Sequence, residues 1–174
     1  MSVATVIKYI EYLKDSFIIS EVSRYDIKGR KYIGSPHKYY FEDIGLRNAR
    51  LNFRQLESSH IMENILFNEL RYRGYNVDVG IVEKRILDNE GKFRRNTYEV
   101  DFIATLGSRK YYVQSALDMA SQEKEEQEFS LRNIDDSFKN IVVVKDIIKV
   151  HRDEDGIVTI GLMDFLQNST SLDF

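Results

Sequence analysis

The first third of the chain changes its pattern of apolar residues once. Apolar side chains recur every three to four positions over residues 3–17, which is typical of a helix with one apolar face, and Ser2 before them is a favourable N-terminal cap. Residues 17–25 then alternate between apolar and polar, residues 26–29 offer a turn, and residues 31–41 alternate again. The pattern predicts a helix followed by a two-stranded hairpin.

A second unit begins after the polar stretch at residues 47–59. Helical spacing returns over residues 60–73 and ends at Gly74, a residue that commonly terminates helices. Three alternating segments separated by turn residues follow, and they predict an antiparallel meander. The predicted strands are residues 77–87, 97–106 and 110–116.

The remaining segments complete an αβββαβ order. Residues 118–132 are highly charged with a few apolar anchors, typical of a surface helix, and residues 140–144 form an apolar run typical of a buried strand. Residues 147–150 and 157–162 predict a final hairpin, and residues 163–167 predict a short helix. We therefore expect an α/β (α+β) fold with a mixed sheet.

Composition excludes several classes of protein. The 174 residues contain no Cys and only three scattered His, which excludes disulfides, thiol catalysis and Cys-type zinc sites and argues against any zinc site. No apolar run approaches the ~18 residues that span a bilayer. The first residues also lack the pattern of a secretory signal, so we expect a cytoplasmic protein without membrane contact.

Charge is distributed unevenly along the chain. Residues 1–50 carry nine Lys or Arg against six Asp or Glu, and residues 51–174 carry sixteen against twenty-two, which indicates two segments with different partners. The basic residues of the predicted hairpin are candidate contacts to DNA phosphates, and a solvated basic hairpin is the alternative. These residues are Arg24, Lys28, Arg30 and Lys31.

Acidic residues at predicted core positions are the candidate chemistry. Glu63 falls on the apolar arc of the helix over residues 60–73, where a carboxylate must be paired with a cation, protonated, or bound to a metal ion. An ordinary buried ion pair is the simpler interpretation.

The middle predicted strand adds two more acids. Strand alternation places Glu99, Asp101 and Ile103 on one face, with Val100 and Phe102 on the other. An ordinary meander register brings Gln114 beside Asp101. We therefore expect Glu99, Asp101 and Gln114 to form a metal site with Glu63 nearby, because Mg²⁺ and Mn²⁺ prefer such oxygen ligands.

These residues carry a resemblance to a known superfamily. Glu63 in HIMENILFNELRYRGY, Asp101 in YEVDFIA and Gln114 in YYVQSA resemble the three motifs of the PD-(D/E)XK nucleases, which use the same αβββαβ order. With KYYFEDIGLRNAR (residues 38–50), nearly the whole chain is similar to the uncharacterised C-terminal domain of many prokaryotic AAA-type ATPases. That resemblance implies a partial winged helix over residues 1–46, a restriction-endonuclease-like domain over residues 47–168, and a tail over residues 169–174.

The chain departs from the resembled pattern in two places. It contains no GxxxxGK[ST] phosphate-binding loop, so we expect no ATP site and no ATP hydrolysis by this chain. The lysine that the third motif places two residues after Gln114 is replaced by Ala116, and Lys124 on the following helix is a candidate substitute. Loss of one charged transition-state stabiliser costs about 3–4 kcal/mol, so cleavage should be weak or absent.

Three functions follow as hypotheses. The first is a nuclease-fold module, catalytically weak or inactive, that binds nucleic acid or a protein partner on behalf of an ATPase, with Glu63, Asp101 and Gln114 as vestiges of a catalytic site that binds Mg²⁺ or Mn²⁺ weakly. The second is an active metal-dependent DNA nuclease. The third is an accessory protein-interaction domain without a nucleic-acid role, which suits the acidic second segment because phosphates would repel it.

Overall fold

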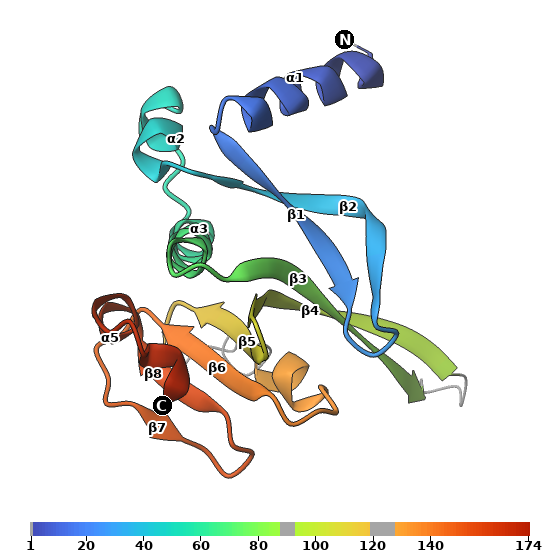
Figure 1. The fold of residues 1–174 in the computed structure, drawn as a ribbon, viewed down its shortest axis with the longest axis vertical. Coiled ribbons are helices and arrows are strands. Elements are labelled where there is room, and N and C mark those ends of the chain that lie inside the picture. The colour runs from blue at the N-terminus through green and yellow to red at the C-terminus, as the bar shows by residue number, and fades with distance from the viewer. Residues whose placement is uncertain (1, 88–92, 119–127) are drawn as a thin grey trace.

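The computed structural model describes residues 2–87, 93–118 and 128–174, and the side chains of residues 85–87 lie outside this description. Eight strands of the described chain form one mixed sheet in the order β2-β1-β3-β4-β5-β6-β8-β7 (Figure 1). Helices pack on both faces of this sheet, as the two apolar clusters described below show. The expected mixed α/β class is therefore confirmed.

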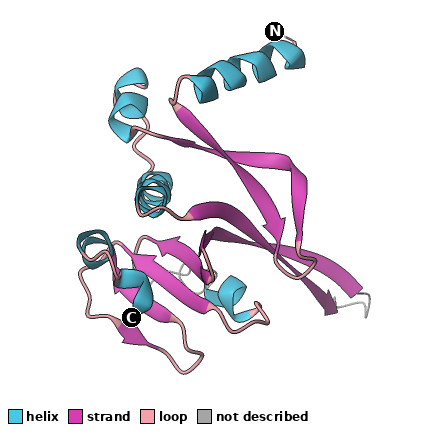
Figure 2. Cartoon of the chain, viewed as in Figure 1, coloured by secondary structure: helices cyan, strands magenta, loops and turns pink. Residues whose placement is uncertain are grey.

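The N-terminal elements follow the predicted pattern. α1 (Val3–Asp15) begins after Ser2, whose side chain accepts a hydrogen bond from the backbone of Thr5. β1 (Ile19–Asp26) and β2 (Lys31–Phe41) form an antiparallel hairpin. β1 also pairs in parallel with β3, so the hairpin extends the main sheet (Figure 2).

A short helix occupies part of the segment interpreted from sequence as a polar stretch. α2 (Ile44–Arg50) begins after Asp43, whose carboxylate accepts a hydrogen bond of 2.8 Å from the backbone N–H of Leu46. This cap stabilises a helix that has no buried residue, which is why the apolar pattern did not reveal it.

The helix and meander of the second unit are confirmed. Gly74 ends α3 with a φ of 87°, a conformation that glycine adopts without strain. The following three strands pair antiparallel in chain order, and β4 begins four residues earlier than predicted. The elements are α3 (Ser58–Tyr72), β3 (Asn76–Leu87), β4 (Phe93–Leu106) and β5 (Arg109–Ala116).

The chain then returns to the sheet in parallel. β6 (Lys139–Val144) pairs in parallel with β5, and β8 (Val158–Gly161) pairs in parallel with β6. Within the predicted helix of residues 118–132, residues 128–132 are helical and residues 119–127 lie outside the described residues. No described helix is both long enough and apolar enough to cross a membrane.

The first strand of the final hairpin begins four residues later than predicted. Residues 147–150 are not a strand, and β7 (His151–Arg152) pairs with β8 instead. The reason is the turn at residues 153–156, closed by a bond from Gly156 N to Asp153 O, which places the residues just before it opposite β8. α5 (Leu162–Gln167) follows, and the predicted tail contains η1 (Ser171–Asp173).

Two apolar clusters lie on opposite faces of the sheet. The first includes Leu66 and Leu70 of α3 together with Phe165 of α5. The second includes Leu131 of the helix at residues 128–132 and Tyr112 of β5. Each face of the central strands is therefore covered by helix, and polar groups there need partners within the protein.

Candidate carboxylate site

Glu63 projects from α3 into a nearly closed environment, with 14% of its side chain exposed. Its Oε1 accepts hydrogen bonds from Lys38 Nζ at 2.7 Å and from the hydroxyl of Tyr40 at 2.5 Å. Burial, together with the charge of Glu63, raises the pKa of Tyr40, so that hydroxyl remains a donor. The buried acid expected from the helix pattern is therefore paired with a cation.

The same lysine binds a second carboxylate. Lys38 Nζ lies 2.6 Å from Glu99 Oε1, and the other oxygen of Glu99 is 3.0 Å from the guanidinium of Arg24. Burial opposes the charge of Lys38, but Glu63 and Glu99 outweigh it and raise the pKa of Lys38. The four side chains therefore form a row of alternating charge that joins β1 and β2 to α3 and β4.

Beside this row, the end of β2 is held against α3 by hydrogen bonds between the backbone of Phe41 and the side chain of Asn64. The N–H of Phe41 donates to the side-chain oxygen of Asn64, and the side-chain nitrogen of Asn64 donates to the carbonyl of Phe41. Asn64 is buried and adjacent to Glu63 in sequence. These two bonds fix the strand that carries Lys38, so the ion pair with Glu63 is positioned by the fold.

Asp101 lies at an irregularity of β4. Between the register pairs Asp78 with Ile103 and Gly80 with Val100, β4 contains one residue more than β3, which is a β-bulge. The carboxylate of Asp101 accepts hydrogen bonds from the backbone N–H and the hydroxyl of Ser115, at 2.8 and 2.7 Å. Burial, reinforced by the charge of Glu63, raises the pKa of Asp101 to about 7.

Gln114 bonds to the backbone of the bulge. Its side-chain oxygen accepts from the backbone N–H of Asp101 at 2.8 Å, and its nitrogen donates to the carbonyl of Glu99 at 2.9 Å and to the hydroxyl of Ser130 at 2.6 Å. The residue is fully buried. Its carboxamide therefore bonds to backbone groups of β4 just beyond the point where the β4–β5 pairing ends, at Phe102 and Val113.

The bulge corrects the predicted faces of β4. Val100 packs with Ile103 in the second cluster, whereas Phe102 packs in the first, so strict alternation from Glu99 to Ile103 does not hold. On β5, Tyr112 and Ala116 belong to the second cluster, and Gln114 lies between them at the same parity. Gln114 thus faces away from α3, and the predicted grouping of its oxygen with Glu63 is wrong.

The arrangement does not fit a divalent cation as it stands. Glu63 and Glu99 are bonded to Lys38, Asp101 is bonded to Ser115, and the oxygen of Gln114 is bonded to a backbone N–H. Among residues 2–87, 93–118 and 128–174, no group of three or more His, Cys, Asp or Glu side chains is placed to hold a metal ion. Ala116 is buried in the second cluster, and Lys124 lies outside the described residues.

The four basic hairpin residues separate into two roles. Arg24 is committed to Glu99 within the sheet. Lys28, Arg30 and Lys31 lie at the turn between β1 and β2 and are exposed. Three of the four candidate phosphate contacts are therefore accessible, and the fourth belongs to the charge row.

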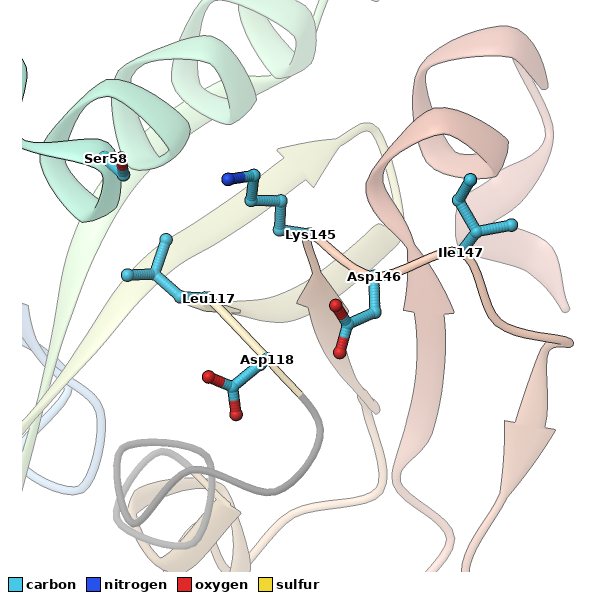
Figure 3. Close-up of a pocket in the computed structure, with 6 residues that line it drawn as sticks. All are labelled: Ser58, Leu117, Asp118, Lys145, Asp146 and Ile147. Atoms are coloured by element: carbon cyan, nitrogen blue, oxygen red, sulfur yellow. The ribbon is translucent and has the colours of Figure 1, made fainter.

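A pocket of about 580 Å³ opens at the carboxyl ends of β5 and β6, next to the start of α3 (Figure 3). Its lining includes Leu117, two residues beyond Ser115, and Ser58, five residues before Glu63. The side chain of Lys145 extends across the pocket toward α3 (Figure 3). Residues that line the pocket are therefore close in sequence to residues of the carboxylate site, and Lys145 is a second lysine in this region.

Sequence reasoning missed the main partners of the acids. Lys38 and Tyr40 alternate along β2 and so share a face, a signal that was available, but their contact with α3 depends on how the hairpin folds over the sheet. Ser115 could not be assigned from the sequence, because strict alternation in β4 places Gln114, its neighbour, beside Asp101. The bulge in β4 decides whether Ser115 or Gln114 lies next to the carboxylate of Asp101.

Comparisons with known proteins find a family match over the N-terminal part and two relatives over more of the chain. Residues 1–57 match a domain of unknown function, DUF8612. An uncharacterized protein of Haemophilus influenzae is 31% identical over 162 residues, which is 93% of this chain and 36% of that protein. The uncharacterized protein MJ1544 of Methanocaldococcus jannaschii is 30% identical over 122 residues, which is 69% of this chain and 24% of that protein.

The chain therefore spans about a third of the length of the first relative and less of the second. No solved structure matches the chain significantly.

Proposed function

We propose that this chain is a restriction-endonuclease-like module of an ATPase-related protein, which binds duplex DNA and cuts it weakly or not at all. The preceding α1 and hairpin correspond in this proposal to the last helix and wing of a winged helix. The activity that the module serves belongs to a longer protein, since the relatives extend well beyond the matched segment.

The order and pairing of the central elements support the fold part of the proposal. α3 is followed by the antiparallel β3, β4 and β5, a segment that is helical at residues 128–132, and β6 in parallel with β5. This is the αβββαβ order of the resembled superfamily. Glu63 on the helix and Asp101 on the middle strand are close enough for the charge of one to affect the pKa of the other.

One observation carries the inactive part of the proposal. Lys38 binds both Glu63 and Glu99, so two of the acids that would hold a metal ion already have a cation between them. The lysine expected after Gln114 is absent, because that position is Ala116. A site with neutralised carboxylates and without that cation retains the framework of a nuclease but lacks the groups that stabilise phosphoryl transfer.

Duplex binding and cleavage are tested together. We expect fluorescence anisotropy with a 20-base-pair duplex to show weak binding that falls as salt is added. A plot of the logarithm of the binding constant against the logarithm of the salt concentration should fall more steeply by about 0.9 for each phosphate contact. Changing Lys28, Arg30 and Lys31 to Ala should weaken binding and flatten the slope. The control changes Arg50 and Arg54 to Ala, because these exposed residues lie in and after α2, at the other end of the molecule (Figure 1).

Two outcomes would replace the proposal. Cleavage of the duplex in Mn²⁺ or Mg²⁺ that is lost in Asp101→Asn would establish the active nuclease. An absence of salt-dependent binding by the wild-type chain would leave the accessory protein-interaction domain as the better explanation.

A further inference from the structure

β3 and β4 continue past the rest of the sheet as a two-stranded ribbon. On one side, the last register pair of β1 with β3 is Asp26 with Ile81, and on the other, β5 pairs only with residues 102–106 of β4. Beyond these points, among the residues that the structure describes, the two strands pair only with each other, out to Leu87 and Phe93. Six residues of β3 therefore extend roughly 20 Å beyond the paired sheet, at about 3.3 Å per residue (Figure 1).

The two faces of this ribbon differ in what covers them. On one face Lys84 lies over the ring of Phe129, 5.1 Å from its centroid, and Tyr98 packs edge-on against the same ring. The other face carries Phe93 and Arg95, which are 73% and 60% exposed. The helix at residues 128–132 thus covers part of one face, and the face of Phe93 and Arg95 is open.

Charge on the ribbon suits an external anion. Arg95 is a cation on the open face of the ribbon, with 60% of its side chain exposed. Arg95 is balanced within the ribbon by Glu83, 3.0 Å away, through an exposed ion pair of the kind that contributes about 0–1 kcal/mol. Arg95 can therefore exchange this partner for a phosphate at little cost.

The basic turn of the N-terminal hairpin lies next to the ribbon. The N–H of Ile27 donates to the carbonyl of Ile81, so the turn with Lys28, Arg30 and Lys31 lies beside the base of the ribbon. The basic turn and the ribbon thus lie at the same end of the sheet (Figure 1).

We infer that the open face of the β3–β4 ribbon is a second contact to duplex DNA, with Arg95 reaching a phosphate while the basic turn holds the neighbouring stretch. A two-stranded ribbon matches the roughly 12 Å width of the major groove, which is why duplex rather than single-stranded DNA is the partner. This inference rests on the proposed duplex binding and adds the element that performs it.

The test compares Arg95→Ala, Arg95→Lys and Lys84→Ala by anisotropy with the same 20-base-pair duplex over a range of salt concentrations. Lys84→Ala is the matched control because it removes one positive charge from the covered face of the same ribbon. We expect Arg95→Ala to weaken binding several-fold and to flatten the salt slope by about 0.9, and Arg95→Lys to restore the slope. Circular dichroism melts confirm that each variant is folded.

The results separate this inference from the proposed function. If wild type binds the duplex but Arg95→Ala and Lys84→Ala bind alike, the ribbon contact is wrong and duplex binding by the basic turn stands. If wild type does not bind the duplex, the proposed function itself fails. Equal, Arg95-dependent binding of a single strand would overturn the assignment of duplex DNA as the partner.

Discussion

Lys38 Nζ lies 2.7 Å from Glu63 Oε1, so a strand of the N-terminal hairpin supplies the counterion for a carboxylate on the central helix. The same nitrogen lies 2.6 Å from Glu99, which makes Lys38 the point where β2, α3 and β4 meet. This contact links the N-terminal hairpin to the central helix and the middle of the sheet. Stability and any activity of the carboxylate site should therefore both depend on Lys38.

Changing Lys38 to Met should destabilise the fold by about 2–4 kcal/mol, because it leaves Glu63 largely buried without its cation. Urea denaturation measures the change. Lys14→Met is the control, since Lys14 pairs with Glu11 and Glu21 at the surface and should cost about 1 kcal/mol or less. Equal losses in both variants would show that the Lys38 contact is an ordinary surface pair.

Asp101 should make stability depend on pH. Its pKa of about 7 in the folded state lies above the ordinary value of 3.8, so the folded state binds this proton more tightly. Its contribution is fully present below about pH 4 and is lost as the pH rises to about 7.

Asp101→Asn should remove this dependence. Relative to wild type, the variant should gain up to about 4 kcal/mol in unfolding free energy between pH 4 and pH 8. Urea denaturation at several pH values measures it, with Asp15→Asn as an exposed control that follows the wild-type profile. Parallel curves for wild type and Asp101→Asn would contradict the raised pKa.

Gln114→Glu separates a structural role from a metal-binding one. The substitution removes the amide donor to the Glu99 carbonyl and Ser130 and places a charge in a fully buried position, so we expect a loss of about 2–4 kcal/mol. Thermal melts with and without Mn²⁺ measure it, and Gln114→Met controls for lost hydrogen bonds without added charge. A melting temperature of the wild-type chain that rises when Mn²⁺ is added would instead favour a metal site.

Ala116→Lys should not restore a nuclease. Although the third motif reserves this position for lysine, Ala116 is buried in the second apolar cluster, and an ammonium there would cost several kcal/mol or force the backbone to move. We expect a large drop in melting temperature and no duplex cleavage in Mn²⁺. Ala49→Lys, at an exposed position of α2, is the matched control and should leave the melting temperature unchanged.

Much of the architecture was predictable because it depends on short-range patterns. Helical spacing located α1 and α3, alternation located β3 to β5, and the apolar run at residues 140–144 located β6. α2 was missed because a helix without a buried face leaves no apolar period. The position of β7 was missed because the turn after it sets its register.

That Glu63 needs a partner can be predicted without a structure, because helix geometry alone places it on the apolar arc of α3. The identity of that partner, Lys38, depends on long-range packing, because the contact spans twenty-five residues and requires the hairpin to join the sheet beside β3. The bulge likewise places the carboxylate of Asp101 beside Ser115, whereas alternation along β5 leaves Gln114 on the face away from Glu63. Periodicity fixes which residues share an element, but one extra residue in a strand exchanges its faces, and only strand pairing reveals it.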